Sequence, residues 1–349
     1  MPTTVSLINV TMPVFNRYDI TQAAILALRE TSQEIPFCLT VVDNGSDAPL
    51  VRRLIDFKER GIIDHLFLLP TNMGVACAAN IGWQLVDAPI YMKLDNDIVI
   101  TEPHWLKKLL CLWRHGQPLS TLGGAFNREM LLKYPGALRT RDGILGICRT
   151  NLAGQAILIP KEVSDILGRW NEDYGLYGTE DGDYGARMIA AGFPQYYYHG
   201  PDFFRDLGKS DNTKTYFARN VDKGKEAQEA WETADGKLGL FVTNATLYDE
   251  CIRSFKIMPR YAVVDIVNNY YVHVIEREEY KQFRPVLEGI AQLFTELVNK
   301  RTLNQRFDPE LVLRMKESLA RFGQSSDDME RAAMAAERKG IQVFAGTEQ

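Results

Sequence analysis

An acidic motif ends an apolar run near residue 90. The run Tyr91-Met92-Lys93-Leu94 predicts a strand, and it stops abruptly at Asp95-Asn96-Asp97. Two carboxylates on either side of one residue are costly to crowd together unless they share a cation. Hard divalent ions prefer oxygen ligands, and Mg²⁺ or Mn²⁺ takes one or two carboxylates together with ligand phosphates. The motif therefore predicts a Mn²⁺ or Mg²⁺ site, with a solvated turn as the alternative.

A second acidic cluster lies at Gly178-Thr179-Glu180-Asp181-Gly182-Asp183. We expect Thr179 to cap a helix that runs through Asp183 to Ala191, because its hydroxyl can accept from the amides of the first turn. Acidic residues in a first turn complement the helix dipole, although capping requires only one of them. A carboxylate held there can also accept a proton from a hydroxyl nucleophile. The cluster is either a helix cap or the position of a general base.

The elements that must position these motifs alternate between two periodicities. Strand-like apolar runs and helix-like stretches lie at Val5–Val10, Asp19–Thr31, Phe37–Val42, Pro49–Arg60, Ile62–Leu69, Val75–Val86, Ile90–Leu94 and Pro103–Trp113. Apolar strands separated by helices belong in a parallel sheet covered on both faces, with right-handed crossovers. Ligands bind beyond the carboxyl ends of such strands. The polar turns at those ends are Pro13–Arg17, Asp43–Ser46, Thr71–Gly74 and Asp95–Asp97.

Taken together, the motifs resemble glycosyltransferase family 2, whose fold is the GT-A fold. The residues that carry the resemblance are Pro13-Val14-Phe15-Asn16-Arg17, Val41-Val42-Asp43-Asn44-Gly45-Ser46, Asn72-Met73-Gly74 with Ala79-Asn80-Ile81-Gly82, Asp95-Asn96-Asp97, and Trp170-Asn171-Glu172 leading to Gly178–Asp183. The resemblance covers roughly Val5–Ser210. It implies a Rossmann-like, mostly parallel α/β sheet flanked by helices. It also implies transfer of a sugar, with inversion, from a nucleoside-diphosphate sugar to an acceptor hydroxyl. UDP is the commonest nucleotide in this family.

The resemblance also implies a donor site. Its nucleotide-sugar-binding residues would be Pro13, Phe15, Asn16, Arg17, Asp43, Asn72, Gly74, Asn80, Asp95 and Asn96. Phe15 offers an apolar face and Asp43 an acceptor, as a uracil and its ribose require. The turn at Asn72 and Gly74 precedes a helix whose free amides favour anionic groups, so it should lie near the nucleotide.

Roles in metal binding and proton transfer follow from the same resemblance. Asp97, with Asp95, would bind the metal that bridges the two phosphates, and Asp181 would be the general base, with Glu180 and Asp183 as rivals. The family often completes the metal site with a histidine in a His-x-Gly segment. This chain has Asp206 at that position and His199 seven residues earlier, so either could be the third ligand.

Aromatic residues cluster near the expected acceptor side. Trp170 and Tyr177 could contact an acceptor sugar, because flat apolar faces with a polar rim suit sugar rings. The alternative is a packed core beneath a loop. The acceptor itself could be a glycan, a lipid-linked molecule or a protein.

Composition limits the other possibilities. The chain has 349 residues, 46% hydrophobic and 24% charged, which excludes a disordered or fibrous protein. A net charge of -5 gives no overall positive field for nucleic acid. The five cysteines form no Cys-x-x-Cys pair and indicate neither a disulfide framework nor a zinc site. We find no apolar run long enough to span a membrane and no leader, and expect a cytoplasmic protein that could associate peripherally with a membrane.

The chain divides in composition near residue 215. We expect a catalytic domain over residues 1–215 and a mainly helical domain over residues 216–349. Helical spacing extends over Tyr261–Val274, Glu276–Lys300 and Pro309–Phe322. These helices could bind the acceptor, form a homo-oligomer or support the catalytic domain.

Three other classes of protein share parts of this pattern. A sugar-nucleotide nucleotidyltransferase has the same α/β layout, but it carries a Gly-rich, Arg-containing loop after the first strand, where this chain has Pro13-Val14-Phe15-Asn16-Arg17. A dinucleotide-dependent oxidoreductase needs Gly-x-Gly-x-x-Gly there, and the chain lacks it. A non-catalytic carbohydrate-binding protein on the same fold remains an alternative, because fold does not fix function.

Overall fold

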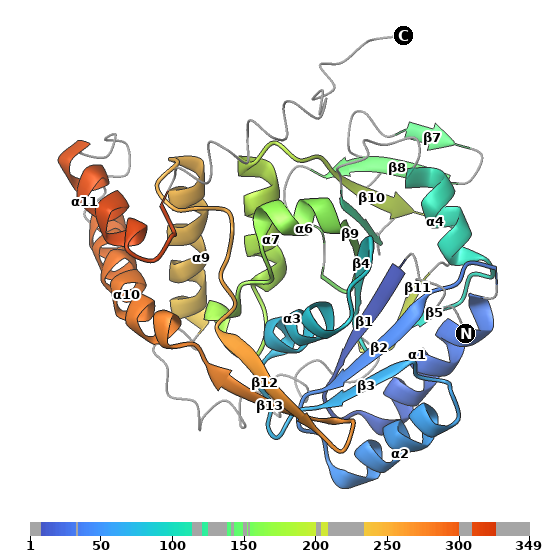
Figure 1. The fold of residues 1–349 in the computed structure, drawn as a ribbon. Coiled ribbons are helices and arrows are strands. Elements are labelled where there is room, and N and C mark those ends of the chain that lie inside the picture. The colour runs from blue at the N-terminus through green and yellow to red at the C-terminus, as the bar shows by residue number, and fades with distance from the viewer. Residues whose placement is uncertain are drawn as a thin grey trace.

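A large mixed β-sheet forms the centre of the molecule (Figure 1). The computed structural model describes residues 8–32, 34–113, 121–124, 138–140, 143–148, 152, 154–199, 204–208, 234–299 and 309–325. The strands of the large sheet are β1 (Ile8–Val14), β2 (Cys38–Asp43), β3 (His65–Leu68), β4 (Ile90–Leu94), β6 (Thr121–Gly124), β7 (Leu138–Thr140), β8 (Gly143–Cys148), β9 (Ala156–Pro160), β10 (Gln195–His199), β12 (Tyr261–Val267) and β13 (Tyr271–Glu276). Their order is β12-β13-β3-β2-β1-β4-β9-β6-β10-β8-β7. A separate small sheet pairs β5 (Ile98–Ile100) with β11 (Phe204–Asp206).

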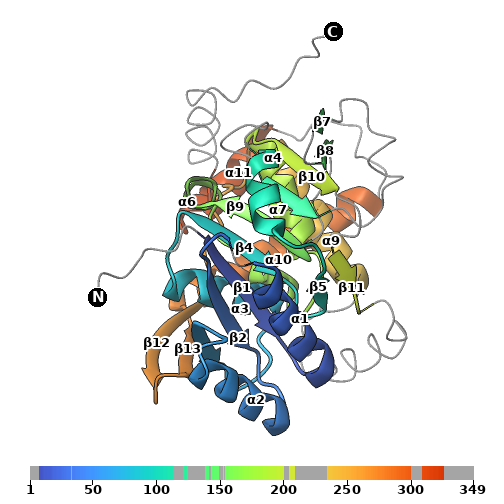
Figure 2. The same ribbon diagram turned by 90° about the vertical axis from the view of Figure 1, so that its right-hand side faces the viewer.

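Helices cover both faces of this sheet (Figures 1 and 2). They are α1 (Tyr18–Thr31), α2 (Ala48–Glu59), α3 (Val75–Leu85), α4 (Trp105–Trp113), α6 (Lys161–Leu167), α7 (Glu180–Ala190), α9 (Ala234–Asp249), α10 (Glu278–Asn299) and α11 (Pro309–Ala320), with a 3₁₀ helix at Glu172–Tyr174. One core cluster joins the strands to α1, α2 and α4. A second joins them to α3, α6 and α7. This α/β architecture agrees with the predicted fold class.

The strands β3, β2, β1 and β4 are neighbours and run parallel. Their carboxyl ends therefore lie along one edge of the sheet, as the sequence predicted. The first strand extends further than expected, to Val14, and Pro13 is a buried strand residue paired with Val42. Pro13 thus helps to form the end of β1, and its place among the nucleotide-sugar-binding residues stays a prediction.

The face of β1 toward α3 is polar, and glycine lets the helix approach it. The Asn9 amide Nδ2 donates to the carbonyl oxygens of Gly82 and Val86. A Cβ atom at Gly82 would overlap the side chain of Thr11. The close packing of α3 on β1 therefore depends on a residue without a side chain.

The segment Tyr261–Val274 is not a helix, contrary to the sequence prediction. It forms the hairpin β12–β13, which joins the sheet through parallel pairing of β13 with β3. Asn268 and Asn269 form the turn with φ of 51° and 66°, a backbone that asparagine tolerates better than most residues. Val263, Val264, Ile266 and Val267 are β-branched and favour a strand, and the Asn-Asn pair is the turn signal that helical spacing concealed.

The helices α9, α10 and α11 pack together beyond α7, on the left of Figure 1. Their shared core contains Leu247, Phe283, Leu287 and Leu319. The helices predicted at Glu276–Lys300 and Pro309–Phe322 are confirmed as α10 and α11. The predicted boundary near residue 215 lies outside the described residues. Among those that are described, no helix combines the length and apolar character needed to cross a membrane.

Candidate active site

Side-chain amides join the turns at the carboxyl edge of the parallel strands. The backbone N–H of Asn16 donates to Ser46 Oγ at 2.8 Å, and the Asn16 side-chain oxygen accepts from the N–H of Asp47 at 2.8 Å. Asn44 donates to the carbonyl of Gly74 at 3.0 Å and accepts from the N–H of Met73 at 2.8 Å. These contacts make one continuous rim. The Asn16 side-chain oxygen is part of this rim. Its observed contact thus holds the turns together, whereas the sequence predicted a contact with the sugar nucleotide.

Asp43 lies inside this rim at 1% exposure. Its Oδ2 accepts from the N–H of Ser46 at 3.1 Å, whereas its buried Oδ1 has no hydrogen-bond partner among the described residues. Burial raises the pKa of this carboxyl above its usual range. A buried acceptor atom without a partner is costly, and a ligand N–H or O–H would satisfy it. Phe15, half-buried at the end of β1, stands at the same edge.

Two amides at the start of α3 already have partners within the protein. The N–H of Val75 donates to the carbonyl of Leu176 at 3.1 Å, and the N–H of Gly74 donates to the Asn72 side chain at 3.0 Å. A Cβ at Gly74, whose φ is +94°, would overlap the carbonyl oxygen of Gly175. Segment 175–176 therefore covers the helix start. The amides of Gly74 and Val75 are therefore not available to an anion, and Asn72 and Gly74 connect two loops.

Two other predicted contact residues are buried in the core. Asn80 is 4% exposed, and its side chain binds the backbone N–H and carbonyl of Trp170 and the carboxylate of Glu172. Trp170 is fully buried and packs against Trp83 and Tyr184. Asn80 thus connects α3 to the segment of Trp170, and neither the Asn80 nor the Trp170 side chain faces solvent. The packed-core alternative holds for Trp170, whereas Tyr177 is 45% exposed.

The motif Asp95-Asn96-Asp97 occupies the bend between β4 and β5. Asp97 Oδ2 forms an ion pair with Arg17 Nη1 at 2.7 Å. Its Oδ1 is buried and lacks a hydrogen-bond partner in the part of the chain that the structure describes. Asn96 donates to Thr21 Oγ1 at 2.7 Å and so ties the bend to α1. Arg17 and Asn96 therefore orient the motif, and one oxygen of Asp97 is left for a ligand.

Asp95 and Asp181 lie on two sides of a buried lysine. Lys93 Nζ donates to Asp95 Oδ1 at 2.6 Å and to the carbonyl of Gly154 at 2.7 Å. The N–H of Gly154 donates to Asp181 Oδ2 at 3.1 Å. Burial raises the pKa of Asp95, and the Lys93 ammonium opposes that shift. The structure therefore brings the two acidic motifs together, although 86 positions separate Asp95 from Asp181 in the sequence.

Asp206 joins the same group. It lies on β11 opposite Ile98, the residue after Asp97, and the N–H of Leu207 donates to the Asp97 carbonyl at 2.9 Å. Gln155 Nε2 donates to Asp206 Oδ2 at 3.2 Å. A Cβ built at Gly208 would meet the carboxylates of both Asp97 and Asp206. These two carboxylates therefore face one point. For His199 the structure describes only the backbone, which pairs with Ile144 at the end of β10.

The oxygen atoms at this edge fit a hard divalent cation. Within the described residues, no three His, Cys, Asp or Glu side chains converge closely enough to hold a metal by themselves. The buried Oδ1 of Asp97, which has no partner among the described residues, and the nearby carboxylates of Asp95 and Asp206 nevertheless supply hard oxygen ligands. A cation here would need oxygens from a ligand as well. That requirement matches the usual coordination of Mg²⁺ and Mn²⁺ by few carboxylates plus phosphates.

The three acids of the first turn of α7 have different surroundings. Asp181 is half-buried, Glu180 is 6% exposed and Asp183 is fully buried. Burial, then the Asp181 charge, raises the pKa of Glu180 to about 7. Thr179 occupies the cap position with a φ of 78°, and its hydroxyl makes no capping hydrogen bond, so that part of the prediction is wrong. Asp181 is the most accessible of the three carboxylates.

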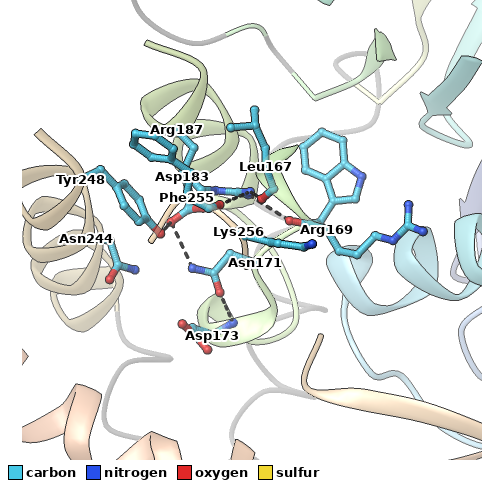
Figure 3. A network of polar contacts seen from close by, with 12 residues as sticks. Leu167, Arg169, Asn171, Asp173, Asp183, Arg187, Asn244, Tyr248, Phe255 and Lys256 are labelled. Carbon is cyan, nitrogen blue, oxygen red and sulfur yellow. Dashed lines mark hydrogen bonds and ion pairs between the residues drawn. The ribbon is translucent and has the colours of Figure 1, made fainter. Parts of the chain in front are cut away.

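Asp183 is the centre of a buried polar network (Figure 3). Its carboxylate accepts from Arg187 Nε at 2.7 Å, Tyr174 Oη at 2.9 Å, Asn171 Nδ2 at 3.0 Å and Tyr248 Oη at 3.1 Å. Arg187 also donates to the carbonyls of Leu167, Arg169 and Phe255. With four donors and no exposure, Asp183 cannot receive a proton from an acceptor. It is removed as a rival for the general base.

Two residues of this region had no role assigned from the sequence. Lys93 lies between the acidic motifs, and the feature that could have revealed it is the presence of a lysine in an otherwise apolar strand. Glu172 is buried and accepts from Asn80 and from the N–H groups of Arg260 and Tyr261. Burial raises the pKa of Glu172 to about 7. Its position in the motif Trp170-Asn171-Glu172 could have indicated a role, but the sequence pattern does not reveal which residues it contacts.

Parallel strands β3-β2-β1-β4, with an acidic bend after β4 and a helix bearing carboxylates above the same edge, define an α/β domain of the GT-A type. Residues 9–134 match the family model described as Glycosyl transferase family 2. The match to this family, which the motifs indicated, thus covers the strands β1 to β4 and the acidic bend after β4.

Solved structures similar to the chain include three glycosyltransferases. A mannosyltransferase from Pyrobaculum calidifontis in complex with GDP-Man and Mn²⁺ has 13% identity and a TM-score of 0.48, with 98% of this chain and 88% of that one covered. GalNAc-T7 with UDP, GalNAc and Mn²⁺ has 12% identity and a TM-score of 0.45 (56% and 42% covered), and S. aureus TarS has 13% and 0.43 (69% and 43%). The chain thus spans less than half the length of these last two. No curated protein matches it.

Proposed function

We propose that this protein is a metal-dependent, inverting glycosyltransferase that moves a sugar from a nucleoside-diphosphate sugar, with UDP as the nucleotide, to an acceptor hydroxyl. The observation that carries the proposal is the convergence of Asp95, Asp97 and Asp181 at the carboxyl edge of the sheet. A family 2 domain supports the reaction class. The choice of UDP follows the family resemblance of the sequence.

The nucleotide would bind along the rim of turns. The free Oδ1 of Asp43 is a buried acceptor for an N–H or O–H of the nucleoside, and Phe15 offers an apolar face beside it. Arg17 holds Asp97 and lies at the same edge, where its guanidinium can also meet a phosphate. Asn16, Asn44 and Ser46 keep the rim rigid, so these contacts would be preformed.

Asp97, Asp95 and Asp206 would hold Mn²⁺ or Mg²⁺. When bound, the cation stabilises the negative charge that develops on the departing diphosphate. Asp97 would contribute its Oδ1, which has no partner among the described residues, and the carboxylate of Asp206 lies beside that of Asp97. Asp206 is our choice of third ligand over His199, because β11 brings it next to Asp97.

Asp181 would remove the proton from the acceptor hydroxyl. It is the most accessible carboxylate of α7, and hydrogen bonds from the N–H groups of Gly154 and Gly182 hold it in place. Inversion needs only one base and one departing group on opposite faces of the sugar, so no nucleophilic side chain is required. Tyr177, exposed near the start of α7, is the residue we place on the acceptor side. The acceptor is a glycan, a lipid-linked molecule or a protein.

A screen of nucleotides tests this proposal. The unfolding temperature is measured with UDP, GDP and their sugar conjugates, with and without Mn²⁺, and transfer or donor hydrolysis is then assayed for each stabilising conjugate. A ligand that binds the folded state raises stability by mass action, so we expect stabilisation by a uridine nucleotide that depends on Mn²⁺.

The variant Asp97→Ala should lose the Mn²⁺-dependent part of that stabilisation. Asp265→Ala, which removes an exposed acid on β12, is the matched control and should respond as the unmodified protein does. Stabilisation without any transfer or hydrolysis would favour the non-catalytic alternative. No stabilisation by any nucleotide would refute the donor assignment.

A further inference from the structure

Lys93 carries a charge inside the sheet. It lies on β4 between Met92 and Leu94 and is 1% exposed. An ammonium group taken out of water is strongly destabilising unless charged and hydrogen-bonding partners surround it. A lysine at this position therefore needs partners that use the charge, and the partners it has belong to both acidic motifs.

The ammonium group is held by two oxygens and one ring. Nζ donates to Asp95 Oδ1 at 2.6 Å and to the carbonyl of Gly154 at 2.7 Å. It also lies 5.8 Å from the centre of the Trp170 ring. Since a lysine ammonium has three protons and no lone pair, these contacts fix its position and its direction. Trp170, which the sequence placed on the acceptor side, is part of the wall around this lysine.

Gly154 connects Lys93 with the proposed base, Asp181. The N–H of Gly154 donates to Asp181 Oδ2 at 3.1 Å while its carbonyl accepts from Lys93. A Cβ at Gly154 would lie 3.0 Å from Asp181 Cβ and 3.4 Å from Lys93 Nζ. The next residue, Gln155, accepts from the N–H of Asp95 at 2.8 Å. The turn 154–155 therefore connects Asp95 with Asp181, and Lys93 fixes that turn.

The charges around Lys93 also need it. Asp95, Glu180 and Asp181 all act on it electrostatically, and Asp97 acts on Asp95. Like-charged carboxylates repel one another strongly in a buried setting. Arg17 pairs with Asp97, at the outer end of the group. Lys93 lies between Asp95 and Asp181 and offsets their repulsion.

We propose that Lys93 is a positioning residue, which holds the metal-side carboxylate Asp95 and the base Asp181 in a fixed mutual geometry through the turn 154–155. The proposal rests on the proposed function and deepens it. Lys93 touches no reacting atom and acts only through Asp95 and Gly154. Its loss should therefore impair the chemical step more than binding of the donor.

The first test replaces Lys93 by methionine, which keeps the length of the side chain and removes its charge. We expect kcat to fall roughly a hundredfold, within the range that a positioned base contributes, and the KM for the donor to stay within about threefold. The control is Lys161→Met. Lys161 is an exposed lysine on α6, paired with Asp87, and its removal should leave both constants unchanged.

A second readout does not depend on turnover. Mn²⁺ is titrated into the protein in the presence of saturating UDP, whose phosphates supply the further oxygen ligands, and its dissociation constant is measured by calorimetry. Because Lys93 neutralises part of the charge of Asp95, Lys93→Met should bind Mn²⁺ more tightly, by roughly tenfold. A residue that merely supports folding would weaken metal binding or leave it unchanged. Tighter metal binding together with a lower kcat is thus the signature of the proposal.

Gly154→Ala provides a variant that leaves every charge in place. Its Cβ would press on Asp181, so kcat should fall at least tenfold while the dissociation constant of Mn²⁺ stays within about twofold. If Lys93→Met does not fold, this variant decides the question, and unchanged turnover in it would overturn the proposal. Unchanged kcat in a folded Lys93→Met protein would overturn it equally. Absence of transfer by the unmodified protein with any sugar nucleotide would instead refute the proposed function.

Discussion

Asp181 and Asp183 stand two positions apart in the first turn of α7, and their surroundings divide the work between them. Asp181 is half-buried and bonded to two backbone N–H groups. Asp183 is fully buried and receives four side-chain donors, including the guanidinium of Arg187. An isolated charge of either sign in that interior would be strongly destabilising. The first carboxylate can therefore serve chemistry, whereas the second serves stability.

The substitution Asp181→Asn should therefore affect activity, whereas Asp183→Asn should affect stability. Asp181→Asn should abolish transfer, by about 10²–10⁴-fold in kcat, because an amide cannot accept the proton, while nucleotide affinity stays within a few-fold. Asp183→Asn leaves Arg187 buried without its counter-charge and should lower the free energy of unfolding by about 3–5 kcal/mol. Activity assays and urea unfolding of both variants check this. Undiminished turnover in Asp181→Asn would remove it as the base.

Glu172 predicts a dependence of stability on pH. Burial raises its pKa to about 7, against an ordinary value of 4.5. The folded protein therefore binds this proton more tightly than the unfolded chain does. The stabilisation is complete below pH 4.5 and is lost as pH rises through 7. One pKa unit corresponds to about 1.4 kcal/mol, so the loss amounts to a few kcal/mol.

The measurement is urea unfolding between pH 5 and pH 8, with Glu172→Gln as the variant. The amide does not titrate, so the variant should lose less stability than the unmodified protein over this range. Glu288→Gln, at an exposed position on α10, controls for the loss of a carboxyl group. Parallel pH curves for the unmodified protein and Glu172→Gln would contradict the role of Glu172.

At the scale of elements, the turn before α3 depends on a close backbone contact. Gly74 has a φ of +94°, and a Cβ there would overlap the carbonyl of Gly175. Gly192 also has a positive φ, +74°, but its Cβ would meet nothing within 4 Å. A residue with a side chain would have a strained backbone at either position. Only at Gly74 would its Cβ also clash with a neighbour.

Gly74→Ala should accordingly cost more stability than Gly192→Ala. The control should lose about 1 kcal/mol from backbone strain alone. Gly74→Ala should lose at least twice as much, because segment 175–176 must move away from the helix start. Nucleotide affinity should fall with it, since the same shift disturbs the rim through Asn44. Equal losses in the two variants would show that segment 175–176 yields without cost.

From the sequence, some features of these elements could be predicted and others could not, for physical reasons. Turns that follow apolar strands are local features, so the positions of Asp43, Asp95 and Asp97 at one edge were predictable. Partners across the fold are not local: nothing near Asn80 in the sequence indicates that it binds the backbone of Trp170. The hairpin Tyr261–Glu276 was misread because its residues fit a helical stripe as well. Its strand character comes from pairing with β3.

At the scale of the whole molecule, the C-terminal elements are built into the same structure as the site. The hairpin β12–β13 extends the large sheet at β3, and α9 packs on α7. A Cβ at Gly182, next to Asp181, would lie 3.3 Å from the ring of Phe241 on α9. Tyr248 of α9 donates to Asp183. The residues after 234 therefore support the helix that carries the proposed base, which favours the supporting role among the three we considered.

Arg253 is the residue that best tests this support. It is 1% exposed, donates to Asn244 of α9, and pairs with Asp173, which also binds Tyr280 of α10. Arg253→Met would leave Asp173 buried without its cation and should cost about 3–5 kcal/mol. Asn244 also donates to Tyr174, which donates to Asp183 of α7. Because the network thus joins α7, α9 and α10, we expect the strands as well as the helices to lose stability.

Hydrogen exchange at increasing urea concentrations measures both regions at once. Peptides from β1 and β4 and peptides from α9 and α10 should open at one midpoint, and Arg253→Met should lower both midpoints equally. Lys281→Met, which removes an exposed lysine paired with Glu278 on α10, should leave both unchanged. A midpoint that falls only for α9 and α10 would mean that these helices unfold separately. In that case a boundary near residue 215 would divide two independent domains, and α7 would keep its position without α9.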